Sequence, residues 1–168
     1  PDNYQESPRL VVARGTSPTN MGLSLLANLA AYDFGYISAG KLIERSGSSL
    51  QTMKALEKFQ GHFYNWYDTQ SLKPLLPKYI STVDSGNLAA HLLTLRAGLL
   101  GLPDQKILSP RLFDGLSDTL KILQDVAAKE RLEGEVPAFL ARLQKKLESA
   151  CNVQPIALTA ARLCLEQL

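Results

Sequence analysis

The residues that could do chemistry gather in the first half of the chain. Residues 62–68 (HFYNWYD) alternate aromatic and polar side chains, and residues 79–87 (YISTVDSGN) add further polar groups. Nine of the twelve aromatic residues lie between Tyr32 and Tyr79. Aromatic rings stack on the apolar C–H face of a pyranose, while carboxylates and amides hydrogen-bond its hydroxyls. This combination of residue types suits a sugar.

A structural interpretation of the same residues stays open. Asp84 and Ser85 stand where a helix is predicted to begin, so unpaired backbone N–H groups would add donors to a sugar site. Asp84 could equally serve only as the helix cap, because Asp is among the preferred capping residues. Trp66 could fill the core under the loop, since tryptophan is mostly buried.

Catalysis by a carboxylate pair is a further alternative. Asp68 and Asp84 could act as the acid and base of a glycoside hydrolase, which needs carboxyl groups about 5–5.5 Å or 6.5–9.5 Å apart. The sequence does not give that distance. Other catalytic arrangements find no support, because Ser81 and Ser85 lack a G-x-S-x-G setting and no glycine-rich phosphate loop is present. We expect His91 to be a hydrogen-bonded residue at the edge of the core.

Composition excludes several classes of partner. The 168 residues carry 18 Lys and Arg against 16 Asp and Glu, and the resulting charge of +2 predicts no nucleic-acid binding. No apolar run approaches the ~18–20 residues of a membrane span, so we expect no direct membrane insertion by this segment. Cys151 and Cys164 have no CxxC spacing and predict neither a metal site nor a cofactor.

Helical periodicity predicts an all-α fold of about six helices in antiparallel hairpins, with a long aromatic loop at 62–83. In the first helix, 17–36, Ser17 is the cap and Met21 and Leu25 open the apolar stripe. The second, 38–61, ends at Gly61 as a left-handed cap. A third begins at Asp84, and Pro110, Pro137 and Pro155 open the last three. The loop could hold a short strand at 63–66 or 79–81.

The apolar stripes define the expected core of each helix. The helical spacing selects Leu42, Ile43, Ser46, Leu50, Met53 and Leu56 in the second helix, and Leu88, Leu92, Leu95 and Leu99 in the third. In the fourth helix it selects Phe113, Leu116, Leu120, Leu123 and Ala127, and in the fifth Phe139, Leu140, Leu143 and Leu147. Residues 1–168 then form a single domain or domain fragment, with an extended lead-in at 1–16, a distinctive part at 17–101 and a helical scaffold at 102–168.

Five blocks of sequence closely resemble one stretch of the cyclic β-1,2-glucan synthases. They occur in the same order and are residues 1–6 (PDNYQE), 16–23 (TSPTNMGL), 33–36 (DFGY), 61–69 (GHFYNWYDT) and 83–92 (VDSGNLAAHL). Members of that family are large bacterial inner-membrane enzymes. They join a glycosyltransferase, a middle domain that cyclises the glucan by transglycosylation, and a phosphorylase-like domain.

The resemblance implies a place and a role for this chain. The blocks look like the opening of the glucoamylase-like middle domain, which is similar to an (α/α)6 toroid around a sugar cleft. By analogy, the cleft would be lined by Asn65, Trp66, Tyr67, Asp68, Asp84, Ser85 and Asn87, with Thr19 and Asn20 at its mouth. Trp66 or Tyr67 would be the stacking platform.

We therefore expect a fragment that supplies β-1,2-glucan-binding surface and scaffold, without catalytic carboxylates of its own and inactive alone. It would be soluble, on the cytoplasmic side, with the remainder of the parent polypeptide as its partner. Uncovered helix faces would favour a homodimer. The alternatives are a glycoside hydrolase that uses Asp68 and Asp84, and a helical protein-interaction module.

Overall fold

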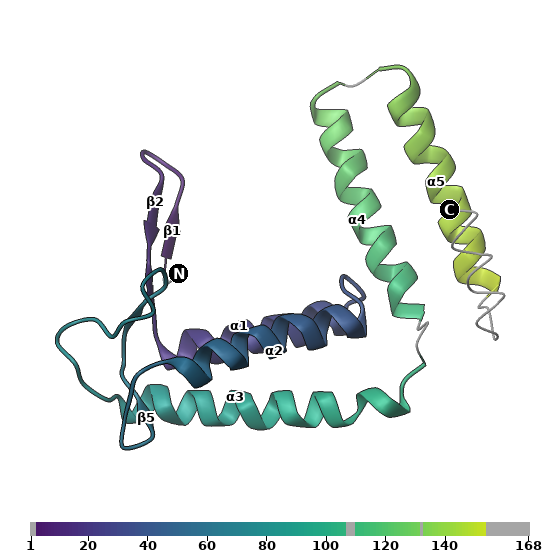
Figure 1. Cartoon of the computed structure of the whole chain (residues 1–168). Helices are drawn as coiled ribbons and strands as arrows, with labels where there is room; N and C mark the ends of the chain where they lie inside the picture. Colours follow the sequence, from purple (N-terminus) through teal and green to yellow (C-terminus); the bar gives the residue numbers. More distant parts are fainter. Residues whose placement is uncertain (1–2, 107–109, 132, 154–168) are drawn as a thin grey trace. The chain divides into compact units, whose positions relative to one another are not determined.

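The computed structural model describes residues 3–106, 110–131 and 133–153, and in this part of the chain the fold is mostly α-helical, as predicted (Figure 1). The chain divides into two compact units. The first comprises Pro1–Ala30 and Gly40–Pro103, and the second comprises Ala31–Ala39 and Asp104–Leu168. Five α-helices are described, and the sixth helix predicted from Pro155 lies outside the described residues.

Three helices supply most of the first unit: α1 (Pro18–Asp33), α2 (Ala39–Ala55) and α3 (Thr82–Leu100). The last three residues of α1 and the first residue of α2 are grouped with the second unit. The helix α1 begins as predicted, because the Ser17 hydroxyl accepts a hydrogen bond from the backbone N–H of Asn20 (3.3 Å). The helices α1 and α2 run antiparallel, with α3 lying along them (Figure 1). Their shared core consists of Met21, Leu25, Met53, Leu56, Tyr67, Leu88 and Leu95.

The apolar stripe of α2 is narrower than predicted. Leu42, Met53 and the hydroxyl-bearing Ser46 are buried, but Ile43 is 58% exposed and Leu50 is 37% exposed. The buried positions follow four- and seven-residue steps, and Ile43 and Leu50 lie to one side of the stripe that these positions form. Their predicted place in the core was wrong. The stripe of α3 is confirmed, with Leu88 and Leu95 buried and Leu92 and Leu99 packed against the core.

The end of α2 and the start of α3 differ from the prediction. The helix α2 ends at Ala55, and Gly61 instead forms the turn between β4 (Lys58–Phe59) and β5 (His62–Phe63). Gln60 and Gly61 both have positive φ (49° and 85°), as a two-residue hairpin turn of type I′ requires. The helix α3 begins at Thr82, and its cap is Ser81, whose side chain accepts from the backbone N–H of Asp84 (3.1 Å).

Short strands tie the lead-in to the aromatic loop. The strands β1 (Asn3–Gln5) and β2 (Val11–Ala13) form an antiparallel hairpin. The strand β3 (Gly15–Thr16) then pairs antiparallel with β6 (Tyr67–Asp68). The loop thus holds β5 and β6, whereas the strand considered at 79–81 is absent from the assigned elements of the described chain.

The second unit is built on a helical hairpin of α4 (Pro110–Lys129) and α5 (Glu135–Val153). Its core is Phe113, Leu120, Ala127, Leu140, Leu147 and Ala150. Seven-residue steps relate most of these positions, which is the spacing of a narrow coiled-coil seam. Leu116, Leu123 and Phe139 were predicted in the core but are 37%, 51% and 54% exposed, because they lie beside that seam. A short 3₁₀ helix, η1 (Leu102–Asp104), follows α3 in the sequence.

Candidate functional site

Asp84 is the centre of a polar network at the start of α1 and α3. Its Oδ1 accepts a hydrogen bond from the Thr19 hydroxyl (2.7 Å), although the two residues are 65 positions apart. The Thr19 hydroxyl in turn accepts from the Asn87 side-chain amide (3.1 Å). Thr19, predicted at the mouth of a cleft, therefore links Asp84 and Asn87, which were predicted to line it.

The aromatic loop enters the same network through Asn65. When the Asn65 amide is oriented so that both its ends find partners, its nitrogen donates to Asp84 Oδ2 (2.9 Å). Its oxygen then accepts from the indole Nε1–H of Trp66 (2.8 Å) and from the Tyr79 hydroxyl (2.8 Å). A backbone bond from Asn65 N–H to the Tyr79 carbonyl (2.8 Å) holds the two parts of the loop together. The Asn65 side chain itself is buried.

The network keeps the Asp84 carboxyl ionised. Burial alone would raise its pKa, but hydrogen bonds from Ser81, Thr19 and Ser17 hold the pKa below its usual value. The predicted role of Asp84 as the helix cap is wrong, because Ser81 takes that position. Asp84 lies in the first turn instead, where its negative charge also suits the helix dipole.

Tyr67 is a core residue and not a stacking platform. Its side chain is 0% exposed, and its hydroxyl donates to the Glu57 carbonyl (2.7 Å) and accepts from the backbone N–H of Tyr64 (2.9 Å). Burial raises the pKa of this phenol. Since a sugar can stack only on a ring that has at least one accessible face, the expectation that Tyr67 stacks is wrong. Trp66, in contrast, is partly exposed.

Asp68 holds a turn through one of its two oxygens. Its Oδ1 accepts from the backbone N–H groups of Gln70 (3.1 Å) and Ser71 (2.7 Å) and from the Ser71 hydroxyl (2.8 Å). These hydrogen bonds lower the pKa of Asp68, and the bond from the Ser71 backbone N–H has the largest effect. Asp68 is absent from the network around Asp84, so the two carboxylates of the hydrolase alternative have separate hydrogen-bond partners.

The remaining candidates serve local structure. The Ser85 hydroxyl donates to the Ser81 carbonyl (2.8 Å) in the first turn of α3. The ring of His91 packs against α1, where a Cβ on Gly22 would come within 2.3 Å of its Nδ1. That buried Nδ1 finds no hydrogen-bond partner within the described residues, so the hydrogen bond predicted for His91 is missing at this atom.

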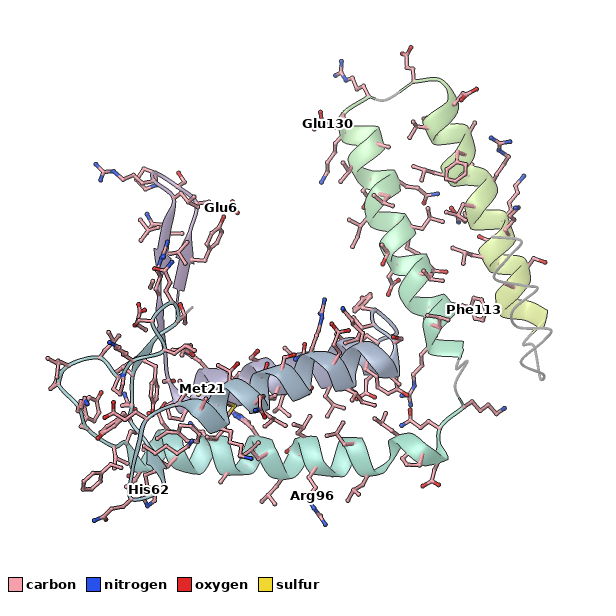
Figure 2. All side chains as sticks on the ribbon, viewed as in Figure 1. Glu6, Met21, His62, Arg96, Phe113 and Glu130 are labelled. Atoms are coloured by element: carbon pink, nitrogen blue, oxygen red, sulfur yellow. The ribbon has the colours of Figure 1, made fainter. Side chains whose placement is uncertain are left out.

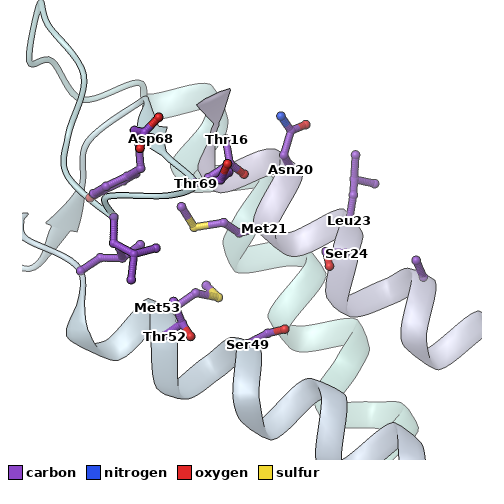
Figure 3. Close-up of a pocket in the computed structure, with 14 residues that line it drawn as sticks. Thr16, Asn20, Met21, Leu23, Ser24, Ser49, Thr52, Met53, Asp68 and Thr69 are labelled. Atoms are coloured by element: carbon purple, nitrogen blue, oxygen red, sulfur yellow. The ribbon is translucent and has the colours of Figure 1, made fainter. Parts of the chain in front are cut away.

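A pocket of about 580 Å³ lies beside the network, between α1, α2 and the 67–72 turn (Figure 3). Asn20, Tyr67 and Asp68 line it, and they are among the residues that the resemblance places at a glucan cleft or its mouth. Sequence reasoning missed its hydroxyl-bearing residues, which are Thr16, Ser24, Ser49, Thr52 and Thr69. Ser49 carried a usable signal, because it lies on the buried stripe of α2 between Ser46 and Met53.

The described residues hold neither a metal-binding cluster nor a membrane-spanning helix. No group of three or more His, Cys, Asp and Glu side chains gathers there as a metal site would require. Within the same part of the chain, no helix combines the length and apolar character needed to cross a membrane.

Comparison with known proteins agrees with the blocks of sequence described above. The chain is 46% identical over 95 residues to the cyclic β-(1,2)-glucan synthase NdvB of Rhizobium meliloti (strain 1021). This chain resembles a segment of a cyclic β-1,2-glucan synthase. The match covers 56% of the chain but only 3% of that protein, so the chain spans a small part of the synthase's length. No family model matches the chain.

The resemblance of the sequence blocks to the cyclic β-1,2-glucan synthases is thereby confirmed at the level of a fragment. Thr19, Asn65 and Asp84 come from three different synthase-like sequence blocks, which are residues 16–23, 61–69 and 83–92. Hydrogen bonds join these three residues in one network. Residues that one family pattern singles out therefore meet in space.

Proposed function

We propose that this chain contributes a β-1,2-glucan-binding surface and scaffold to the transglycosylation domain of a cyclic β-1,2-glucan synthase. The first unit would form part of the (α/α)6 ring of that domain. The remainder of the parent polypeptide would be its partner. In the parent, placed by the resemblance at the bacterial inner membrane, this segment would face the cytoplasm.

The observation that carries the proposal is the fixed position of the Trp66 indole. Its Nε1–H donates to Asn65, which is itself held by the ionised Asp84 and by Tyr79. An aromatic platform binds a sugar better when its orientation is set in advance, because less side-chain freedom is lost on binding. The Trp66 ring is the stacking group of the proposed surface.

Exposure divides the candidate residues into two roles. Asn87 is exposed, and Thr19, Asn20, Trp66 and Asp68 are partly exposed, so these side chains are proposed to contact glucan. Asn65 is 6% exposed and is proposed to position Trp66. Ser85 stabilises the start of α3 through its hydrogen bond to the Ser81 carbonyl. Asp84 fixes Thr19, at the mouth of the surface, by accepting its hydroxyl hydrogen bond. Such a surface binds the acceptor glucan while reacting groups come from elsewhere in the parent.

A hydrolase that uses Asp68 and Asp84 is less well supported. A glycosidase needs one carboxyl group whose pKa is raised, so that it can protonate the leaving oxygen. The pKa values of both Asp68 and Asp84 are lowered by hydrogen bonds, as described above. Neither group is suited to be the general acid, and we propose that the chain alone is inactive.

The proposal is tested by calorimetric titration of the chain with linear β-1,2-glucan, together with an assay for new reducing ends and cyclic products. We expect saturable binding and no turnover, with the wild type and with Asp68→Asn and Asp84→Asn. Turnover that either substitution abolishes would favour the hydrolase. Trp66→Leu should weaken binding by about tenfold or more, since it removes the aromatic face on which the sugar is proposed to stack. A matched control is Phe59→Leu, an exposed aromatic residue on β4.

A second candidate function is self-association or protein binding through the second unit. Its helical hairpin exposes several large apolar side chains, which are Ile122 (62%), Leu123 (51%), Val126 (49%), Val136 (48%) and Phe139 (54%). Exposed apolar residues in such number are typical of interaction surfaces. We propose a homodimer through these faces. Size-exclusion chromatography with light scattering tests it, and a monomer at all concentrations would count against it.

A further inference from the structure

The pocket between α1 and α2 has a lining that suits a neutral, hydroxyl-rich ligand. Hydroxyl groups are contributed by Ser24, Ser49, Thr52 and Thr69, while Met21 and Met53 provide apolar surface. Figure 3 shows both methionine side chains between the two helices, with Asp68 and Thr69 on the turn above them. Asp68 is the one charged residue among those that line the pocket. A ligand with either sign of net charge would find no matching set of groups.

Several polar atoms of this pocket lack a protein partner. The structure gives the hydroxyls of Ser24, Ser49 and Thr69 no hydrogen bond to any residue that it describes. Asp68 uses only Oδ1 for its turn, which leaves Oδ2 without a hydrogen-bond partner in the described chain. The lowered pKa of Asp68 keeps this oxygen ionised and able to accept from a hydroxyl.

The volume and lining of the pocket favour a short sugar chain over an apolar helix as its occupant. Its volume of about 580 Å³ falls within the ~300–1,000 Å³ of small-molecule sites. An apolar helix in this place would bury the serine and threonine hydroxyls and the Asp68 carboxylate away from water without hydrogen bonds. Each such loss is unfavourable. A short sugar chain supplies both partners for these hydroxyls and C–H faces for the methionines.

We propose that this pocket is a glucan subsite of its own, in which Ser24, Ser49, Thr69 and Asp68 Oδ2 hydrogen-bond the hydroxyls of glucosyl units that lie across Met21 and Met53. The nature of the sugar rests on the function proposed above. The pocket adds a second binding element next to the Trp66 network, and a glucan chain could occupy both. Asn20 lines the pocket and follows Thr19 of the network, so the two elements adjoin.

The test is calorimetric titration of the full chain with linear β-1,2-linked glucotriose. Ser49→Leu fills the pocket from α2, and we expect the Kd to rise at least tenfold. Ser48→Leu places the same side chain on the preceding, exposed position of α2, outside the pocket lining, and it should leave the Kd within about twofold. Thr69→Val removes one hydroxyl with little change of shape, and we expect a Kd about three- to tenfold higher. Thermal melting followed by circular dichroism checks that each variant is folded.

Three outcomes would overturn the inference. A Ser49→Leu chain that binds as well as the wild type, while Trp66→Leu does not bind, would place the sugar on the Trp66 network alone and leave the proposed function intact. Equal losses in Ser49→Leu and Ser48→Leu would show a general effect on α2. A folded wild type that binds no β-1,2-glucan would overturn both this inference and the proposed function.

Discussion

The two units of this chain achieve their specific folds by different means. In the first, polar side chains from distant segments meet, as in the Thr19–Asp84 hydrogen bond across 65 positions. In the second, apolar residues at seven-residue steps set the contact between α4 and α5, and one interhelical bond joins Gln124 to Gln144 (2.8 Å). The first pattern depends on particular residues, and the second requires only residues of an apolar type.

This difference has a consequence for function. A polar network in which most members are satisfied fixes a single arrangement, because any other leaves buried groups without partners. Such an arrangement can hold Trp66 in one orientation. An apolar seam tolerates exchange among aliphatic residues of similar size. We therefore expect sugar binding to depend on the first unit, with the second unit serving as scaffold.

Removing a large side chain from the apolar seam should have the largest effect on stability. Leu147 is 3% exposed, and Leu147→Ala should lower the free energy of unfolding of the second unit by about 3 kcal/mol. Circular dichroism would report this change, while the emission of Trp66 reports only on the first unit. Leu123→Ala, at a 51% exposed position of α4, is the control and should change stability little. A shift of the Trp66 transition by the same amount would show that the two units unfold as one.

Removing the centre of the polar network should have a comparable effect on the first unit. Asp84→Ala deletes the acceptor of the Thr19 and Asn65 hydrogen bonds and should cost about 2 kcal/mol. The emission of Trp66 should shift to longer wavelength, because the indole is no longer held by Asn65. The control is Asp118→Ala, which removes an exposed ion pair with Lys121. Wild-type emission and stability in Asp84→Ala would contradict the proposed role of the network.

The close approach of α1 and α3 can be tested with a single methyl group. A Cβ on Gly22 would come within 2.3 Å of His91 Nδ1, so Gly22→Ala should lower the free energy of unfolding by about 2 kcal/mol. Gly47→Ala is the matched change on α2, where no atom lies within 4 Å of the added Cβ. There alanine should stabilise the helix by roughly 0.5–1 kcal/mol. Equal effects at both glycines would mean that the helices are further apart.

The buried hydroxyl of Ser46 offers a change in the opposite direction. Ser46 is 2% exposed, and its Oγ has no hydrogen-bond partner within the described residues. Ser46→Ala should therefore raise the free energy of unfolding by about 1 kcal/mol. Urea denaturation measures the change, with Ser48→Ala as the control for helix propensity alone. A loss of stability in Ser46→Ala would indicate that the hydroxyl has a partner.

Acid should weaken the first unit before the second, and we expect this to be the smallest effect. The folded-state pKa of Asp84 lies below its unfolded value, so its contribution is fully present above the unfolded pKa, about 3.9. That contribution is lost as the pH falls through the lower, folded pKa. The Trp66 unfolding midpoint, measured from pH 6 down to pH 2, should fall more steeply in the wild type than in Asp84→Asn. Parallel profiles would contradict the assignment.

Local signals predicted the helices better than their ends. Ser17 and Pro18 fixed the start of α1, because capping acts through neighbouring atoms. Gly61 was misread as a helix cap because a positive φ serves a hairpin turn equally well. Ile43 and Leu50 were misplaced because a wide apolar stripe does not reveal how narrow the actual contact is. Only tertiary packing settles that width.

The candidate site shows the same limit. Family-like blocks pointed to Thr19, Asn65, Trp66 and Asp84, and these residues meet. Burial of the Tyr67 ring was not predictable, since an aromatic residue between polar neighbours can face either way along a strand. The pocket was missed because its hydroxyls come from three separate segments, which only the fold brings together.

The central claim is that the first unit binds β-1,2-glucan without reacting with it, and the emission of Trp66 tests this most directly. Trp66 is the single tryptophan of the chain, so its signal is unambiguous. We would titrate linear β-1,2-glucan, with β-1,3-glucan as the control, and follow emission and product formation together. The account predicts a saturable change with the β-1,2-linked polymer alone and no product. No spectral change up to millimolar sugar, or cleavage of the glucan, would contradict it.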